Sequence, residues 1–164
     1  VDVEKMDLPT LFKACKEAGS ELEKPLTHGE MVMELFDLKV EDKIWHPTII
    51  KDFPREISPL TKVHRENPRL VERFEPICAG MEIGNAYSEL NDPEDQLARL
   101  QEQESKRLVD EEAQPMDENF MHAIDVGMPP TGGVGVGVER IIMLITDCPS
   151  IRDIILFPTM KKEH

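Results

Sequence analysis

Three side chains that could bind a charged small molecule alternate along one predicted β-strand. The stretch from residue 73 to residue 90 carries an amide, an aromatic ring and a carboxylate at alternate positions, namely Asn85, Tyr87 and Glu89. Because alternate residues of a strand share a face, we expect these three to lie side by side. A carboxylate can pair with an ammonium group while an aromatic ring covers its aliphatic stem. The set therefore predicts a pocket for a small cationic ligand; the alternative is a polar, solvent-facing side of the strand.

Two glutamates in the same stretch could hold a metal ion. We expect a hairpin turning near Ala79 and Gly80, and a turn on Cys78 and Ala79 would set Glu75 directly opposite Glu82. Their Cβ atoms would then be roughly 5 Å apart. Carboxylates that close repel unless a cation bridges them or one is protonated. A few hard oxygen ligands, completed by phosphates, are typical of Mg²⁺. The alternative is two exposed glutamates around a different turn.

Strict alternation poses a difficulty for a single pocket, because it places Glu82 on the face opposite to the three ligand-binding candidates. One extra residue in the strand would bring all four side chains to one side, and Gly84 is a position where a bulge is tolerated. The sequence therefore predicts a bulge or a strong bend between Met81 and Asn85.

A second informative stretch, residues 131–140, alternates glycine and valine and ends in an arginine. It lacks the Gly-Lys-Ser/Thr ending of a P-loop and the glycine spacing of a dinucleotide-binding fingerprint. The alternation predicts a strand whose bare face, formed by Gly133, Gly135 and Gly137, lets a flat group lie on the backbone. Arg140 would then lie in the first turn of the next helix and could reach a polyphosphate. The alternative is a glycine face packed on a helix, with Arg140 in a surface ion pair.

The elements that must position these residues form an α+β pattern, in which an antiparallel β-sheet is flanked by helices. Two amphipathic helices are predicted in the first forty residues, the second with a capping box at Thr27 and Glu30. A short strand at 47–52 and an extended loop at 56–60 follow. Further helices are predicted from 93 to about 108, from 117 to 127 and from 139 to 147, with an acid-rich loop at 110–114.

Composition limits the classes of function. The chain has 164 residues, 40% of them hydrophobic, and a formal net charge of −14. That charge argues against a free-standing nucleic-acid binder or a binder of anionic membranes. No apolar run approaches the roughly 18 residues that span a bilayer. The three scattered cysteines fit neither a disulfide framework nor a zinc site, which favours a reducing, cytoplasmic location.

Four further segments carry a resemblance to a known family. The glycine strand and its arginine-headed helix, residues 131–147, resemble motif 3 of class II aminoacyl-tRNA synthetases. Together with these, four runs resemble the C-terminal part of the catalytic domain of class II lysyl-tRNA synthetase, in the family's order over residues 27–161. They are Glu56-Ile-Ser-Pro-Leu60, Glu82-Ile-Gly-Asn-Ala-Tyr-Ser-Glu-Leu-Asn-Asp92, Gly127-Met-Pro-Pro-Thr131 and Ile151-Arg-Asp-Ile-Ile-Leu-Phe-Pro158.

This resemblance implies roles for individual residues. It implies Mg²⁺ held by Glu75 and Glu82, and an ATP site formed by these two with Gly137 and Arg140, of which Arg140 is the catalytic residue. It also implies a lysine site, formed by Asn85, Tyr87, Glu89 and Gly135. The implied reaction is the formation of lysyl-adenylate from lysine and ATP, followed by transfer of lysine to tRNA(Lys). The complete enzyme would be a cytoplasmic homodimer.

The resemblance also implies a division of the chain. Residues 1–45 resemble the family's helical insertion, and residues 46–164 resemble the C-terminal half of the catalytic domain. The anticodon-binding barrel and motifs 1 and 2 have no counterpart in these residues, so we expect a fragment that does not form lysyl-adenylate alone. Two alternatives stay open, both for a stand-alone paralogue: a ligase that attaches lysine to a protein, and a non-catalytic interaction module.

Overall fold

The computed structural model describes residues 3–107 and 117–159, so the predicted acid-rich loop at 110–114 lies outside the described residues. The described elements follow one another along the chain with these bounds: η1 (Val3–Lys5), α1 (Leu8–Ala18), α2 (His28–Lys39), η2 (Glu41–Lys43), β1 (Thr48–Pro54), η3 (Arg55–Ile57), β2 (Leu70–Cys78), β3 (Met81–Glu82), β4 (Gly84–Ser88), α3 (Pro93–Arg107), α4 (Glu118–Gly127), β5 (Gly132–Val136), α5 (Val138–Thr146) and α6 (Ile151–Ile154).

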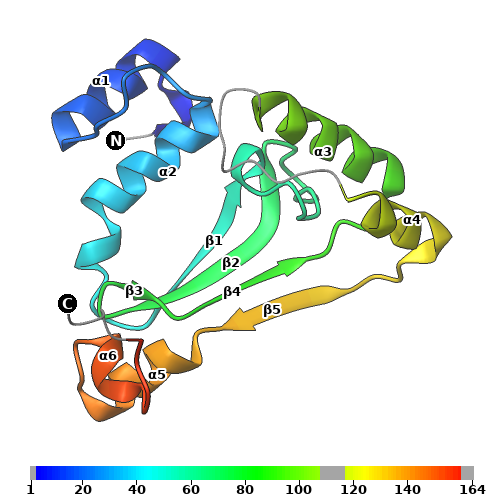
Figure 1. Cartoon of the computed structure of the whole chain (residues 1–164). Helices are drawn as coiled ribbons and strands as arrows, with labels where there is room; N and C mark the ends of the chain where they lie inside the picture. Colours follow the sequence, from blue (N-terminus) through cyan, green and yellow to red (C-terminus); the bar gives the residue numbers. More distant parts are fainter. Residues whose placement is uncertain (1–2, 108–116, 160–164) are drawn as a thin grey trace, which may run out of the picture.

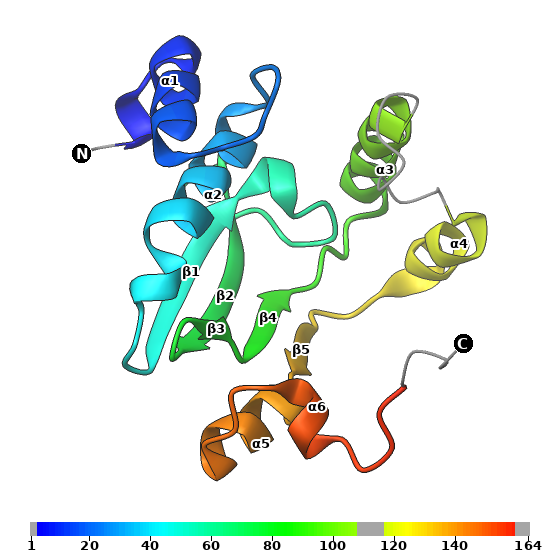
Figure 2. The same ribbon diagram turned by 60° about the vertical axis from the view of Figure 1, so that its left-hand side comes forward.

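An antiparallel sheet lies at the centre of the fold (Figure 1). Its strands follow the order β1-β2-β4-β5, and β3 pairs with the end of β2. Helix α2 lies beside β1, and α1 packs on α2; α3 and α4 lie near one end of the strands, and α5 and α6 lie near the other (Figures 1 and 2). The predicted α+β class, an antiparallel sheet flanked by helices, is therefore confirmed. In the part of the chain that the structure describes, no helix combines the length and apolarity needed to cross a bilayer.

The first two helices begin and end where local chemistry dictates. The Asp7 carboxylate accepts a hydrogen bond from the Thr10 N–H at the start of α1, and Gly19 ends the helix with a φ of 106°. At the start of α2, the predicted capping box is confirmed, because Thr27 and Glu30 bond each other's backbone N–H groups. These caps satisfy N–H groups that the first turn leaves without partners.

A small core joins α1 to α2, and a close contact joins α2 to the sheet. Leu11, Cys15 and Met31 are fully buried between the two helices. A Cβ atom added to Gly29 would lie 2.6 Å from the Cβ of Pro54, so only a glycine allows the start of α2 to approach the end of β1 this closely. The helical segment is thereby fixed against the sheet.

The structure corrects two predicted bounds before the hairpin. Strand β1 runs to Pro54, beyond the predicted end at residue 52, after a register shift at Asp52, whose φ is 63°. The predicted extended loop at 56–60 instead begins with the 3₁₀ turn η3. A proline restricts only the residue before it, so Pro59 keeps Ser58 from helical geometry and leaves the preceding residues free to turn.

The two faces of the sheet differ in burial. Phe53, Val71 and Ile77 share one face and are almost completely buried. On the opposite face, the side chains of Phe74 and Val134 are 44% and 75% exposed. The buried face is the one that also carries the polar residues of the candidate site.

Candidate functional site

The hairpin that carries the acidic residues turns on Ala79 and Gly80, as predicted. Both residues have positive φ angles, 53° and 69°, which are typical of a tight two-residue hairpin turn. This turn pairs Glu82 with Ile77, so Glu82 is not directly opposite Glu75 as a turn one residue earlier would require. The two carboxylates instead occupy diagonal positions, which lie about 7–8 Å apart on neighbouring strands.

The predicted bulge is confirmed. Between the pair Ile77–Glu82 and the pair Phe74–Ala86, β2 advances by three residues and the opposing strand by four. The extra residue falls where β3 ends and β4 begins, and a Cβ added to Gly84 there would lie 2.7 Å from the Gly135 carbonyl oxygen. A glycine at this position is therefore required by the close approach of the next strand.

Because of the bulge, the acidic and ligand-binding candidates lie on one face. Arg73 and Ile77 are four residues apart on β2 and share a face, so their partners across the sheet, Tyr87 and Glu82, share it too. Glu75 lies between them on the same strand. The structure thus brings together the following predicted residues: Glu75, Glu82, Asn85 and Tyr87.

Strand β5 forms the bare floor beside these side chains. Gly135 pairs with Asn85 and Gly133 pairs with Tyr87, so the glycines lie on the candidate face and the valines on the other, as predicted. The Glu89 carboxylate lies over Gly133, where a Cβ would come within 2.2 Å of its Oε1 atom. At Gly135, the nearest atom to an added Cβ is the Asn85 carbonyl oxygen at 3.9 Å, an ordinary van der Waals distance.

The predicted phosphate arginine lies at the far end of this floor. Arg140 is in the first turn of α5, as predicted, and its Nη1 atom donates a hydrogen bond to the Glu82 carbonyl oxygen at 2.6 Å. The same nitrogen is 3.6 Å from the Glu82 carboxylate. Gly137, at the start of the helix, donates its N–H to the Ile83 carbonyl oxygen at 2.9 Å. The start of α5 is thereby joined to the bulge.

Sequence reasoning missed Arg73, which lies in the middle of the candidate face. Its guanidinium donates to the Asn85 Oδ1 atom at 3.1 Å, to the Ser58 hydroxyl at 2.8 Å and to the Glu75 carboxylate. Its Cζ atom also lies 4.6 Å from the centre of the Phe53 ring. The available signal was strand alternation, because Arg73 and Glu75 are two residues apart on one strand.

The carboxyl groups of the site have perturbed acidities. Burial raises the pKa of Glu75, and nearby Glu82 and Glu41 act in the same direction, while Arg73 opposes the rise. Burial also raises the pKa of Glu41, with Asp37 and Glu82 adding to the effect. The helical segment around η2 therefore contributes to the negative potential around Glu75 and Glu82, which sequence reasoning did not foresee.

The same cause acts at the other end of the face. Burial raises the pKa of the Glu89 carboxyl, and burial together with the Glu89 charge raises the pKa of Tyr87. Burial penalises the charged form of the Glu89 carboxyl. An ammonium group placed beside it would act in the opposite direction and favour the charged form.

The chemistry of the donors fits Mg²⁺ better than a tightly ligated transition metal. Within residues 3–107 and 117–159, no group of three or more His, Cys, Asp or Glu side chains could enclose a metal ion. Glu75 and Glu82 offer hard oxygen ligands from neighbouring strands of one face. Mg²⁺ is commonly held by one or two carboxylates, with water and substrate phosphates completing its octahedron.

The sequence as a whole matches one protein-family model. The model is described as tRNA synthetases class II (D, K and N), and the match extends over residues 6–161. The chain belongs to this family of class II synthetases. The match includes both the strands with the acidic residues and the glycine strand with Arg140.

Three relatives of this class II synthetase chain are named lysine–tRNA ligases. A lysine–tRNA ligase of Methanospirillum hungatei is 53% identical over 99% of this chain and 33% of its own length. Those of Moorella thermoacetica and Rhizobium meliloti are 49% and 51% identical, over 96% and 92% of this chain. The chain spans about a third of the length of these curated relatives.

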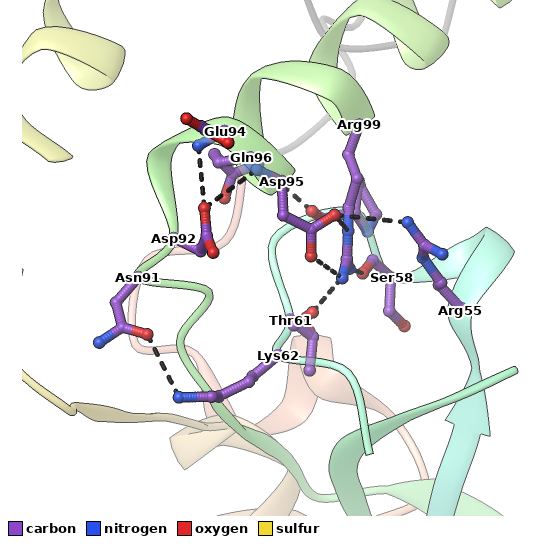
Figure 3. Close-up of polar contacts among 11 residues, drawn as sticks. Arg55, Ser58, Thr61, Lys62, Asn91, Asp92, Glu94, Asp95, Gln96 and Arg99 are labelled. Carbon is purple, nitrogen blue, oxygen red and sulfur yellow. Dashed lines mark hydrogen bonds and ion pairs between the residues drawn. The ribbon is translucent and has the colours of Figure 1, made fainter. Parts of the chain in front are cut away.

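In this class II synthetase chain, α3 supports the site through a buried polar network (Figure 3). The Arg99 side chain is 4% exposed and forms two hydrogen bonds with Asp95, at 3.0 and 2.7 Å. It also donates to the Thr61 carbonyl oxygen at 2.7 Å and more weakly to that of Ser58 at 3.5 Å. Gln96 donates to the Pro59 carbonyl oxygen at 3.3 Å. The loop after η3, which carries the Ser58 hydroxyl to Arg73, is therefore fixed by the helix.

Proposed function

We propose that this chain supplies the lysine, magnesium and ATP-phosphate subsites of a lysyl-tRNA ligase. The observation that carries the proposal is the single face on which a bulge gathers Glu75, Glu82, Asn85 and Tyr87, with Glu89 over the glycine floor. The lysine–tRNA ligase names of its relatives favour lysine as the amino acid. The established family gives class II chemistry.

In the proposed lysine subsite, the two ends of the amino acid meet groups of different kinds. The Glu89 carboxylate would pair with the side-chain ammonium, and the Tyr87 ring would cover the aliphatic stem above Gly135. Asn85 accepts a hydrogen bond from Arg73 through Oδ1, so its Nδ2 group is the donor left for a ligand. A donor at that position suits an oxygen of the substrate.

In the proposed ATP subsite, Glu75 and Glu82 would hold Mg²⁺ and Arg140 would bind the phosphates. Gly137 would leave room for the nucleotide at the start of α5. Bound Mg²⁺ would neutralise charge on the phosphates while the lysine carboxylate attacks the α-phosphate and pyrophosphate leaves. Arg140 would stabilise the same charge through its planar fork of donors. This reaction needs no side-chain nucleophile, so positioning and charge neutralisation account for catalysis.

The proposal also includes the other properties expected of a lysyl-tRNA ligase. They are transfer of lysine from the adenylate to tRNA(Lys), action as a homodimer, and a cytoplasmic location. We infer that the 164-residue chain alone does not form the adenylate, since it corresponds to about a third of its relatives' length.

A chimera tests the proposal directly. This chain would replace the matching third of the Methanospirillum hungatei ligase, and lysine-dependent ATP–pyrophosphate exchange would be measured. The proposal expects exchange well above that of the same chimera carrying Glu82→Gln. A folded, dimeric chimera without lysine-dependent exchange would contradict the proposal and favour a non-catalytic interaction module. Exchange without charging of tRNA would favour a ligase that attaches lysine to a protein.

A further inference from the structure

Arg73 contacts a residue of the proposed magnesium subsite and a residue of the proposed lysine subsite. Its Nη2 atom donates to the Glu75 carboxylate of the proposed magnesium subsite, and its Nε atom donates to the Asn85 Oδ1 atom of the proposed lysine subsite. Its side chain is only 18% exposed. The guanidinium therefore lies between the two subsites and beneath both.

The position of Arg73 is itself strongly constrained. The Phe53 ring lies 4.6 Å from the guanidinium carbon on one side, and the Ser58 hydroxyl accepts a hydrogen bond at 2.8 Å from Nη1. Ser58 is 4% exposed, and the loop that carries it is held by Arg99 of α3 (Figure 3). Each of the three guanidinium nitrogens thus has an acceptor, and the acceptor on Ser58 is held in place independently of Arg73.

This geometry determines how Asn85 faces a ligand. An arginine side chain can only donate hydrogen bonds, so the asparagine atom that faces it must be the oxygen. The amide is then held with its Nδ2 group directed away from Arg73. If the Asn85 amide were reversed, it would present an acceptor where the proposed lysine subsite presents a donor.

We propose that Arg73 is a positioning residue that fixes both the Asn85 amide and the Glu75 carboxylate, and so aligns the lysine subsite with the magnesium subsite. This inference rests on the proposed function for its kinetic consequences, although the geometry of the three residues does not depend on it. A lysine at position 73 would keep the positive charge and lose the flat, three-nitrogen fork. The proposal therefore expects that a lysine at position 73 does not replace the arginine, although it keeps the charge.

The kinetic test compares three variants of the chimera described above. Arg73→Lys is expected to raise the lysine KM about tenfold and to raise the Mg²⁺ concentration for half-maximal exchange, because charge-assisted hydrogen bonds are lost. Ser58→Ala is expected to change both parameters in the same direction and by less. Arg65→Lys is the matched control, because Arg65 is 87% exposed and bonds only Glu72 among the contacts described, so neither parameter should move.

A second measurement is made on the 164-residue chain and does not depend on activity. Nuclear magnetic resonance follows the Glu75 carboxyl signal and the Asn85 side-chain amide signals at one fixed pH. Arg73→Gln removes the hydrogen bonds that the guanidinium donates to the Glu75 carboxylate and to the Asn85 Oδ1 atom, so both sets of signals should shift. Arg65→Gln should leave both unchanged.

The outcomes separate the two proposals. If the parent chimera shows exchange and Arg73→Lys has the same lysine KM and Mg²⁺ requirement, the positioning role is wrong and the proposed function stands. If the parent chimera shows no exchange, the proposed function fails, and the nuclear magnetic resonance measurement alone decides the role of Arg73. Glu75 and Asn85 signals that do not respond to Arg73→Gln would overturn the inference in either case.

Discussion

The Nη1 atom of Arg140 lies 2.6 Å from the backbone carbonyl oxygen of Glu82, to which it donates a hydrogen bond. The two residues belong to the first turn of α5 and to β3, which are distant in sequence. The proposed phosphate ligand and a proposed magnesium ligand therefore position each other. The hydrogen bond goes to the backbone, and the same nitrogen also lies 3.6 Å from the Glu82 carboxylate.

Replacing Arg140 tests the phosphate subsite. In the chimera, Arg140→Gln should lower kcat/KM for ATP in pyrophosphate exchange by about 10²–10³-fold, the usual cost of removing a donor from developing charge. The melting temperature should change little, because an exposed ion pair contributes about 0–1 kcal/mol and a hydrogen bond about 0.5–1.5 kcal/mol. Arg152→Gln, at an exposed position of α6, is the control. An unaltered ATP dependence in Arg140→Gln would contradict the assignment.

Replacing Glu89 tests the choice of substrate. Glu89→Gln keeps the shape of the side chain and removes its charge, so the lysine KM should rise by about 10–100-fold through loss of a charge-assisted hydrogen bond. The ATP KM should stay the same, since Glu89 lies over Gly133, away from Arg140. Steady-state exchange at varied lysine measures the effect. An unchanged lysine KM would contradict the assignment of Glu89 to the lysine subsite.

Two neighbouring glycines provide a matched pair of substitutions. A Cβ at Gly133 would lie 2.2 Å from the Glu89 Oε1 atom, whereas a Cβ at Gly132 would come no closer than 3.9 Å to the Tyr87 carbonyl oxygen. Gly133→Ala should displace the flexible end of Glu89 and raise the lysine KM at least about tenfold. Gly132→Ala should not. Equal lysine KM values for the two variants would show that Glu89 does not act from the position it occupies over β5.

The raised pKa of Glu75 predicts that metal binding depends on pH. Just above the ordinary pKa of a glutamate, part of the Glu75 population is still protonated, and only the ionised form binds a cation. Metal binding should therefore release protons and weaken as the pH falls towards the raised pKa of Glu75. Broadening of nuclear magnetic resonance signals by Mn²⁺ in the 164-residue chain measures it. Glu17→Gln, at an exposed site on α1, is the control, and a pH-independent affinity would contradict the prediction.

The raised pKa of Glu75 also affects the free energy of unfolding. Its effect has the sign opposite to that of a carboxylate whose pKa is lowered on folding. A pKa raised on folding means that the folded state binds the proton more tightly, so this stabilisation is lost as the pH rises through the folded pKa. At neutral pH, Glu75→Gln should not lower the melting temperature, even though it removes a proposed metal ligand. A clear fall would show that the ion pair with Arg73 outweighs burial.

The sequence predicted those features that short-range chemistry controls. The capping box of α2 follows from Thr27 and Glu30, and the bulge follows from the position of Gly84 among residues that must share a face. The alternation of β5 placed Gly133 and Gly135 correctly. Roles of individual residues in binding stay predictions, because geometry alone does not identify a ligand.

Features that depend on distant contacts were not predictable in the same way. The pairing of Glu82 with Ile77 depends on which two residues take positive φ angles in the turn, and one residue of uncertainty changes every partner. Arg73 was missed because its partner Ser58 belongs to another segment of the chain. The contribution of Glu41 to the local field depends on where the helical segment packs on the sheet.

The single extra residue where β3 ends and β4 begins makes the length of this segment as important as its composition. Deleting one residue there would restore even alternation and rotate Glu82 to the back of the sheet, while every other side chain of the site stayed in place. An insertion of one residue would have the same effect. Natural variation in this family should therefore tolerate changes of side chain at the junction more readily than changes in the number of residues across it.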